Sequence, residues 1–178
     1  MAGRPPLPYD FMPPIPSFAL RSDDVADGEM MTSNQLFSGF GMTGKNISPS
    51  LSWSGFPESA ASFAVTCFDP DAPTGSGFWH WVLLDIPATV SSLPAGAGSA
   101  SGAGLPAGAL HLRNDYGTAD FCGAAPPAGD EPHRYVFAVH AVDVPSLELS
   151  PDTTPAVAGF NLRFHAIARA VMIPVYGY

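Results

Sequence analysis

The sequence has few basic side chains. Its 178 residues include only seven Lys and Arg against sixteen Asp and Glu, which gives a formal net charge of −9. Nucleic acids and anionic membrane surfaces are bound through clusters of basic side chains. The composition therefore argues against nucleic acid and a membrane surface as partners. An anionic ligand would have to be held locally, in a small pocket.

Cysteine is also scarce, with only Cys67 and Cys122 in the chain. Two cysteines provide neither a disulfide framework nor a zinc-binding pattern, so free thiols are expected, and no metal or other cofactor is predicted. Each cysteine lies next to one of the polar motifs described below. A redox-dependent bond between them therefore stays open as the alternative to two buried thiols.

Long apolar runs are missing as well. Residues 1–8 are interrupted by prolines and lack the apolar run of a secretory signal, which favours a cytoplasmic location. Residues 86–112 contain no Asp, Glu, Lys or Arg, but Gly, Ala, Ser and Pro interrupt them. A membrane-spanning helix needs about 20 mostly apolar residues in succession, so the sequence predicts no integral membrane segment.

What the chain does contain fits one folded domain over residues 1–178. The length and the 46% hydrophobic content are enough for a sizeable core. Eighteen Gly and twenty Pro indicate many turns between short strands. Within this domain we distinguish a proline-rich N-terminal arm, residues 1–14, and a flexible Gly/Ala-rich loop, residues 94–108.

The pattern of apolar residues predicts a mostly β protein. Short apolar runs between turn signals are typical of strands. Such runs occur at 63–68, 78–86, 109–113 and 135–142, with weaker ones at 18–20 and 51–53. Near the carboxyl end, Thr154 followed by Pro155 is a typical helix start, and apolar residues recur at helical spacing. These features predict a helix over 155–172, ended by Pro174, on the flank of a sheet-rich sandwich.

Two short segments concentrate the polar chemistry. The first, Asp69 to Trp81, crowds two carboxylates, an imidazole and three aromatic rings into thirteen residues between two predicted strands. The second, Pro126 to Tyr135, is a proline-stiffened loop that enters the strand at 135–142. Because a rigid scaffold often presents binding residues at strand ends, the two segments together predict a pocket for a small polar ligand.

With these motifs the sequence resembles the phosphatidylethanolamine-binding protein family, and in particular its bacterial and archaeal branch, often described as Raf-kinase-inhibitor-like. The matching segments are Asp69 to Pro73, His80-Trp81, Gly123, Pro126-Pro127, His133-Arg134-Tyr135, Asn46 to Trp53, Asn114 to Gly117 and the closing helix. The likeness covers residues 15–178. It implies a large antiparallel sheet of Greek-key character, one small cavity at an end of that sheet, and a homodimer.

The chemistry expected in this cavity suits an anion. Imidazoles can donate hydrogen bonds, so His80 and His133 are the predicted donors to a phosphate-like group. If Asp69 accepts a bond from one imidazole, it orients that ring and favours its charged form. Asp71 would brace the loop through backbone N–H groups or meet a ligand amine. Anion binding is then expected to weaken as rising pH removes protons from the two imidazoles.

Neighbouring residues are expected to add contacts. The backbone N–H of Gly123 is a candidate third donor, and the hydroxyl of Tyr135 or of Tyr116 could contact the ligand. The chain departs from the family pattern directly after Gly123, where Ala124-Ala125 precede the prolines. This departure predicts a looser loop and a wider cavity rim.

Strand alternation assigns faces to the remaining side chains. It predicts Trp79 and Trp81 on one face and His80 on the other, so at least one tryptophan belongs to the core. Arg134 is expected on the opposite face from His133, in a structural ion pair with a carboxylate such as Asp85. The candidate wall residues are Phe78, Trp79, Trp81 and Phe121.

The function that the sequence favours is binding of a small anionic ligand, such as phosphate or the phospholipid head group phosphoethanolamine. The alternative is a regulatory inhibitor of a kinase or a serine protease that acts through the same surface. No enzyme is predicted: Ser76, His80 and Asp69 contain the atoms of a catalytic triad, but Ser76 lacks the strand-to-helix elbow of a nucleophile. His140 and His165 are predicted to be structural.

Overall fold

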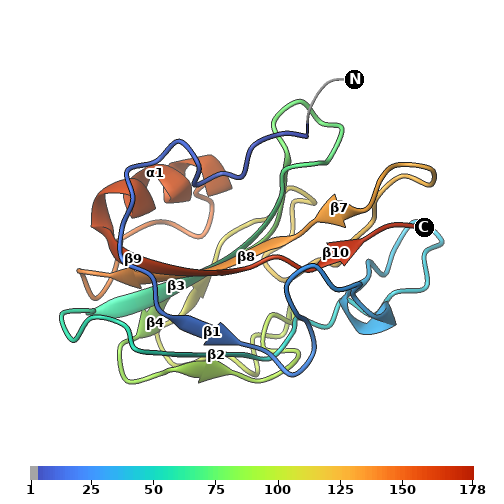
Figure 1. Cartoon of the computed structure of the whole chain (residues 1–178). Coiled ribbons are helices and arrows are strands. Elements are labelled where there is room, and N and C mark those ends of the chain that lie inside the picture. The colour runs from blue at the N-terminus through green and yellow to red at the C-terminus, as the bar shows by residue number, and fades with distance from the viewer. Residues whose placement is uncertain (1–3) are drawn as a thin grey trace.

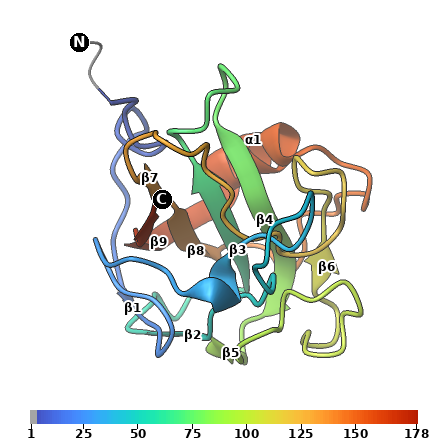
Figure 2. The ribbon, with the colours of Figure 1, turned by 90° about the vertical axis from the view of Figure 1, so that its right-hand side faces the viewer.

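The computed structural model describes residues 4–178. Its centre is a five-stranded antiparallel sheet in the order β6-β4-β3-β8-β9 (Figures 1 and 2). The strands are β3 (Ser62–Asp69), β4 (Phe78–Pro87), β6 (Leu110–His111), β8 (Val136–Val142) and β9 (Ala166–Met172). β3 and β4 form a hairpin, and β8 returns past β4 and β6 to pair with the free side of β3, which is a Greek-key connection.

Two smaller sheets and the helices complete the fold. They are the sheet of β1 (Ala19–Arg21), β2 (Leu51–Ser54) and β5 (Ser92–Leu93), the pair of β7 (His133–Arg134) and β10 (Val175–Tyr176), the 3-10 helix η1 (Ser33–Gln35), and α1 (Pro155–His165). Figures 1 and 2 show α1 on one side of the five-stranded sheet and β1, β2 and β5 on the other. The predicted mostly β sandwich with a helix on its flank is confirmed.

The large sheet is covered on both faces, which explains the unbroken apolar runs in β3 and β4. The face toward the small sheet contributes Phe63, Val65, Cys67, Trp81 and Leu83, packed against Leu51, Trp53 and Leu93. The face toward α1 contributes Ala64, Val82 and Leu84, packed against Ala158 and Leu162. Burying a Val, Leu or Phe side chain is worth about 1.5–3 kcal/mol, so this core fixes the strand ends that lead into the polar segments.

The start of α1 follows the sequence signals. Thr154 caps the helix because its side-chain oxygen accepts a hydrogen bond from the backbone N–H of Val157 (3.4 Å). Pro155 occupies the first turn, where its missing N–H leaves no donor unsatisfied. The helix ends at His165, where the side chain lies 2.9 Å from Asp143 Oδ1. The predicted structural role of this histidine is thereby explained by a hydrogen bond at the helix end.

The second half of the predicted helix is a strand. We expected a helix over 155–172, but residues 166–172 form β9, which pairs with β8 at the edge of the large sheet. Side chains alternate there, with Ala168 and Ala170 buried between more exposed neighbours. Helix propensity is worth only tenths of a kcal/mol per residue. A continuous backbone ladder with β8 therefore outweighs the helical preference of this Ala-rich segment.

The predicted alternation at the start of β4 was wrong because of a β-bulge. Cys67 pairs with Trp81 and Phe68 pairs with Trp79, so His80 is the extra residue between them. As a result Trp79 packs on the α1 side of the sheet, whereas Trp81 packs in the core between the sheets. The expectation that at least one tryptophan belongs to the core is confirmed, because Trp81 is fully buried.

The described part of the N-terminal arm, residues 4–14, packs on the sheet. It passes beside α1 before the chain enters β1 (Figure 1). The Tyr9 ring lies edge-on to His140 of β8, with centroids 5.7 Å apart, and the guanidinium of Arg169 lies 3.9 Å over the same Tyr9 ring. The backbone N–H of Arg169 also donates to the carbonyl of Pro16 (2.9 Å). These contacts join the arm to β8 and β9.

The Gly/Ala-rich loop is tied down by backbone hydrogen bonds. The N–H of Gly98 donates to Ser48 Oγ (2.9 Å), and its carbonyl accepts from the N–H of Phe121 (2.7 Å). None of residues 94–108 lines the site described below. Within residues 4–178, no helix has the length and apolar character needed to cross a membrane.

Candidate ligand-binding site

A cavity of about 180 Å³ lies at the end of the large sheet where β3 and β4 meet the loop before β7. Its lining residues are Asp69, Ala72, Pro73, Thr74, Phe78, His80, Tyr116, Ala125 and His133. The two polar segments singled out in the sequence therefore meet in space. Three predicted site residues, Asp69, His80 and His133, line this one cavity.

Asp69, the last residue of β3, holds both the adjoining loop and one imidazole. Its Oδ1 accepts hydrogen bonds from the backbone N–H groups of Asp71 (2.8 Å) and Ala72 (3.1 Å), which fixes the turn after β3. Its Oδ2 lies 2.7 Å from His133 Nδ1. Both Asp69 and His133 are only 3% exposed. The His133 ring is thus oriented by a buried carboxylate, while its Nε2 lies 3.4 Å from Asp130 Oδ2.

His80 occupies the bulge in β4 and is also buried. Its Nδ1 lies 2.9 Å from the carbonyl oxygen of Cys122 and 3.1 Å from that of Gly123. Carbonyl oxygens only accept hydrogen bonds, so Nδ1 carries the proton. Burial lowers the pKa of His80 despite the opposing effect of these carbonyls and of Asp69. The ring is therefore neutral at pH 7 and offers Nε2 as an acceptor, which corrects the prediction of a charged donor.

An aromatic wall closes one side of the cavity. The rings of Phe78 and Tyr116 meet edge-on with their centroids 4.7 Å apart, and Tyr116 stacks on Phe37 with a centroid distance of 4.3 Å. Burial raises the pKa of Tyr116, so its hydroxyl keeps its proton and can donate to a ligand. The other aromatic residues predicted for the walls do not line the cavity; they are Trp79, Trp81 and Phe121.

Asp71 does not line the cavity and instead pairs with Arg134. Its Oδ2 accepts from the Arg134 backbone N–H (2.8 Å) and Nε (2.9 Å), and its Oδ1 accepts from Nη2 (2.8 Å). Burial alone would raise the pKa of Asp71, but the hydrogen bonds and charge of Arg134, with Arg4, lower it overall. Asp71 therefore braces β7 rather than meeting a ligand. Asp85, the partner expected for Arg134, accepts from Ser146 Oγ (2.7 Å) instead.

Gly123 and Tyr135 support the cavity without lining it. The Gly123 N–H donates to Asn46 Oδ1 (3.0 Å), so the prediction that this N–H is a free third donor was wrong. Glycine is required there because an added Cβ would lie 2.3 Å from the backbone carbon of Leu36. The Tyr135 ring packs 5.2 Å from that of His80, and its buried hydroxyl has no hydrogen-bond partner within residues 4–178.

Sequence reasoning missed two supporting side chains. Asp130 lies three residues before His133 in the same loop, and this spacing was the available signal. Asn46 orients Gly123 from 77 residues away along the chain. No local pattern connects those two positions, so only the folded chain could show the contact.

The electrostatics of the cavity rest on imidazoles and carboxylates. None of its lining residues is Lys or Arg. Among the described residues, no group of three or more His, Cys, Asp or Glu side chains is arranged to hold a metal ion. Cys67 and Cys122 are free, and burial raises the pKa of both thiols, which keeps them protonated. An anion in this cavity would therefore depend on the Tyr116 hydroxyl and, by taking the place of Asp130, on Nε2 of His133.

The family model described as phosphatidylethanolamine-binding protein matches residues 21–177. The chain belongs to the phosphatidylethanolamine-binding protein family. Two Escherichia coli relatives of this family member are UPF0098 protein YbcL, 49% identical over 90% of this chain and 87% of the relative, and UPF0098 protein YbhB, 45% identical over 88% and 98%.

Solved structures of the family agree with the fold of this member. The crystal structure of E. coli YbcL, described as a new member of the mammalian PEBP family, superposes with a TM-score of 0.89 at 49% identity, covering 91% of this chain and 99% of that one. A homologue from Chlamydia trachomatis, CT736, has a TM-score of 0.74 at 27% identity and covers 90% and 97%. The resemblance drawn from the two motifs is confirmed.

Proposed function

We propose that the cavity binds a small ligand carrying a phosphate group, such as phosphoethanolamine or inorganic phosphate, and that the protein is a binding protein rather than an enzyme. The observation that carries this proposal is the pairing of His133 with the buried Asp69 (2.7 Å) in the same cavity as the free Nε2 of His80. The family, named for phosphatidylethanolamine binding, supports a phosphate-bearing ligand.

The hydrogen-bonding capacity of the cavity matches a phosphate monoanion. Such a group has one P–OH donor and several acceptor oxygens. The neutral His80 accepts a hydrogen bond from the P–OH group at Nε2, while the Tyr116 hydroxyl donates to another oxygen, and the ligand takes the place of Asp130 at Nε2 of His133. The apolar ring of Phe78 excludes water from one side.

The charge of the ligand follows from the same side chains. With Asp69 lining the cavity and Asp130 near its edge, a dianion would be repelled, and no Lys or Arg lines the cavity to compensate. A phosphate monoester becomes a dianion above a pH of about 6. Binding should therefore weaken as the pH rises, because the ligand gains a second negative charge.

Calorimetric titration of the full chain with phosphoethanolamine tests the proposal. His133→Gln should weaken binding by about tenfold, since a hydrogen bond to a charged group is lost, and His80→Gln by about fivefold. His165→Gln is the matched control because this histidine lies at the far end of α1, paired with Asp143. Thermal unfolding of each variant establishes that it is folded.

Equal affinity in all three variants, or the absence of saturable binding at millimolar phosphoethanolamine and phosphate at pH 5.5, would overturn the proposal. Release of inorganic phosphate from phosphoethanolamine, abolished in His133→Gln, would instead identify an enzyme. Inhibition of a kinase or a serine protease stays a prediction, and loss of that inhibition in the same variants would place it on this surface.

Location and assembly form a separate part of the proposal. We propose a cytoplasmic protein, which the two free, buried thiols support. Cell fractionation measures the location, and recovery in a membrane or secreted fraction would contradict it. The homodimer stays a prediction that light scattering of the purified chain would decide.

A further inference from the structure

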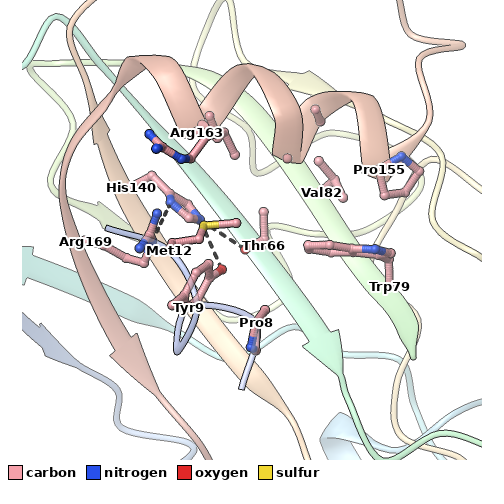
Figure 3. Close-up of a pocket in the computed structure, with 13 residues that line it drawn as sticks. Pro8, Tyr9, Met12, Thr66, Trp79, Val82, His140, Pro155, Arg163 and Arg169 are labelled. Carbon is pink, nitrogen blue, oxygen red and sulfur yellow. Dashed lines mark hydrogen bonds between the residues drawn. The ribbon is translucent and has the colours of Figure 1, made fainter. Parts of the chain in front are cut away.

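A second cavity, of about 80 Å³, lies between α1 and the large sheet, on the opposite side of the sheet from the β1-β2-β5 layer (Figure 3). The N-terminal arm closes it from outside. Its lining residues are Pro8, Tyr9, Met12, Thr66, Trp79, Val82, His140, Pro155, Ala158, Gly159, Leu162, Arg163 and Arg169. It shares no lining residue with the cavity of Asp69 and His133.

The interior of this cavity is suited to an apolar group. Its few polar atoms bond one another: His140 Nδ1 accepts from Arg169 Nε (3.1 Å), and His140 Nε2 lies 3.3 Å from Thr66 Oγ1. Burial, reinforced by the charge of Arg169, lowers the pKa of His140 to about 3, so the ring is neutral. Apart from Tyr9 and Arg163, the rest of the lining is apolar, and in Figure 3 the Trp79 ring forms the end opposite His140.

Two arginines give the cavity a charged end. Arg163 of α1 and Arg169 of β9 both line it, and Figure 3 shows their guanidinium groups on the side of His140. Within residues 4–178, neither guanidinium has a carboxylate oxygen within 4.0 Å. Three of the other four arginines do form such an ion pair, namely Arg4, Arg113 and Arg134. Arg169 is held by His140 and by the Tyr9 ring, so in a chain of net charge −9 two arginines without a carboxylate partner lie beside one apolar cavity.

We propose that this cavity is a second ligand site, which binds a short apolar carboxylate such as butyrate. The hydrocarbon tail lies between α1 and the sheet, and the carboxylate meets the guanidinium groups of Arg163 and Arg169. The volume limits the tail: a water molecule occupies about 30 Å³ of liquid, so a cavity of about 80 Å³ holds about three carbon atoms. The arginine geometry favours a carboxylate over a point-like anion, because a guanidinium binds it through two parallel hydrogen bonds.

Titration of the full chain with butyrate, followed by the NMR signal of the Trp79 indole N–H, tests this site. Trp79 lines the cavity, whereas Trp53 and Trp81 lie in the core between the sheets, so only one of the three indole signals should shift. Butyramide and butylamine have tails of similar length without the negative charge. Butyrate should give a saturable shift, and both control compounds should bind at least about tenfold more weakly.

Substitutions at the charged end and at the tail end separate the two halves of the proposal. Arg163→Gln should weaken butyrate binding by about tenfold; Arg113→Gln, which removes the same charge from an exposed arginine elsewhere, should not. Gly159→Leu should abolish binding by filling the cavity. It should also remain folded, because an added Cβ at Gly159 meets no atom within 4 Å and leucine favours the helix.

Three results would overturn the proposal. The first is butyrate binding no tighter than that of butyramide, the second is a shift that survives in Gly159→Leu, and the third is equal weakening by Arg113→Gln and Arg163→Gln. His133→Gln removes the first cavity's donor, so unchanged butyrate affinity in that variant shows that the two sites are separate. Failure of phosphate binding would leave this result unaffected.

Discussion

The buried imidazole of His140 predicts a protein that loses stability in mild acid. The ring is 2% exposed, and its two nitrogens face Arg169 and Thr66. A proton on Nδ1 would displace the hydrogen bond from Arg169 and place two positive charges in contact. Burial and this neighbouring charge lower the pKa of His140 from its ordinary 6.5 to about 3. In mild acid, His140 therefore stays unprotonated in the folded protein, whereas it binds a proton in the unfolded chain.

The magnitude follows from the difference between the two pKa values. For a histidine whose folded pKa is depressed, stability is complete above pH 6.5 and is lost as the pH falls, because only the unfolded state binds the proton. With 1.36 kcal/mol per pKa unit, the loss from His140 reaches about 2 kcal/mol at pH 5 and about 3 kcal/mol at pH 4. Domains are stable by about 5–15 kcal/mol in total, so the loss from this single ring is a large fraction of the total stability.

Urea unfolding between pH 7.5 and pH 4, compared with the variant His140→Gln, measures this effect. Glutamine can accept from Arg169 and donate to Thr66, but it does not titrate. The two proteins should differ in the slope of stability against pH, and the parent should lose about 2 kcal/mol more than the variant between pH 7.5 and pH 5. Other titrating groups are common to both proteins and cancel in the difference.

Two observations would refute this reasoning. One is parallel stability curves for the parent and the variant, which would mean that His140 takes up its proton equally in both states. The other is an NMR titration in which the His140 ring has a pKa above 5. Either result would show that the N-terminal arm opens easily enough to hydrate the ring, since the arm's Tyr9 covers it.

Three further substitutions probe the site and the helix. Gly123→Ala should destabilise the protein by about 2 kcal/mol in urea unfolding, because the new Cβ would lie 2.3 Å from the Leu36 backbone; an unchanged midpoint would contradict the close packing. Asp71→Asn should cost about 2 kcal/mol at pH 7, since Arg134 loses its partner. This cost should disappear as the pH falls below 3.8, because a carboxylate with a lowered pKa stabilises the fold only while ionised. Gly159→Ala should raise stability by about 0.5–1 kcal/mol, since its Cβ meets no atom within 4 Å, and a lower melting temperature would refute this.

Local sequence patterns were sufficient to predict most of the strands. The runs at 63–68, 78–86 and 135–142 correspond to β3, β4 and β8, because a strand buried on both faces needs an uninterrupted apolar segment of that length. The segment at 166–172 was assigned to a helix because its Ala-rich composition carries no strand signal of its own. Its partner, β8, lies some 30 residues earlier in the chain, and only pairing with that strand makes it β9.

The candidate site, like the strands, was predicted from the sequence only in part. The two motifs were sufficient to predict that Asp69, His80 and His133 line the cavity, since each stands at the junction of a stiff loop and a buried strand. They did not predict that His80 presents Nε2 to the cavity as an acceptor, because the proton is held on Nδ1 by the carbonyls of Cys122 and Gly123. The β-bulge at His80 could not be predicted from the sequence either, because it arises from pairing with β3.

By itself the sequence determined the family, the mostly β core and the meeting of two polar segments, because these depend on residue types at fixed spacing along the chain. Tertiary structure alone decided which carboxylate serves which partner: Asp69 orients His133, whereas Asp71 holds Arg134. It also decided the cavity under α1, whose arginines and apolar wall come from segments with no common motif. Hydrogen bonds and cavities depend on distances between residues far apart in the chain, and those distances exist only after folding.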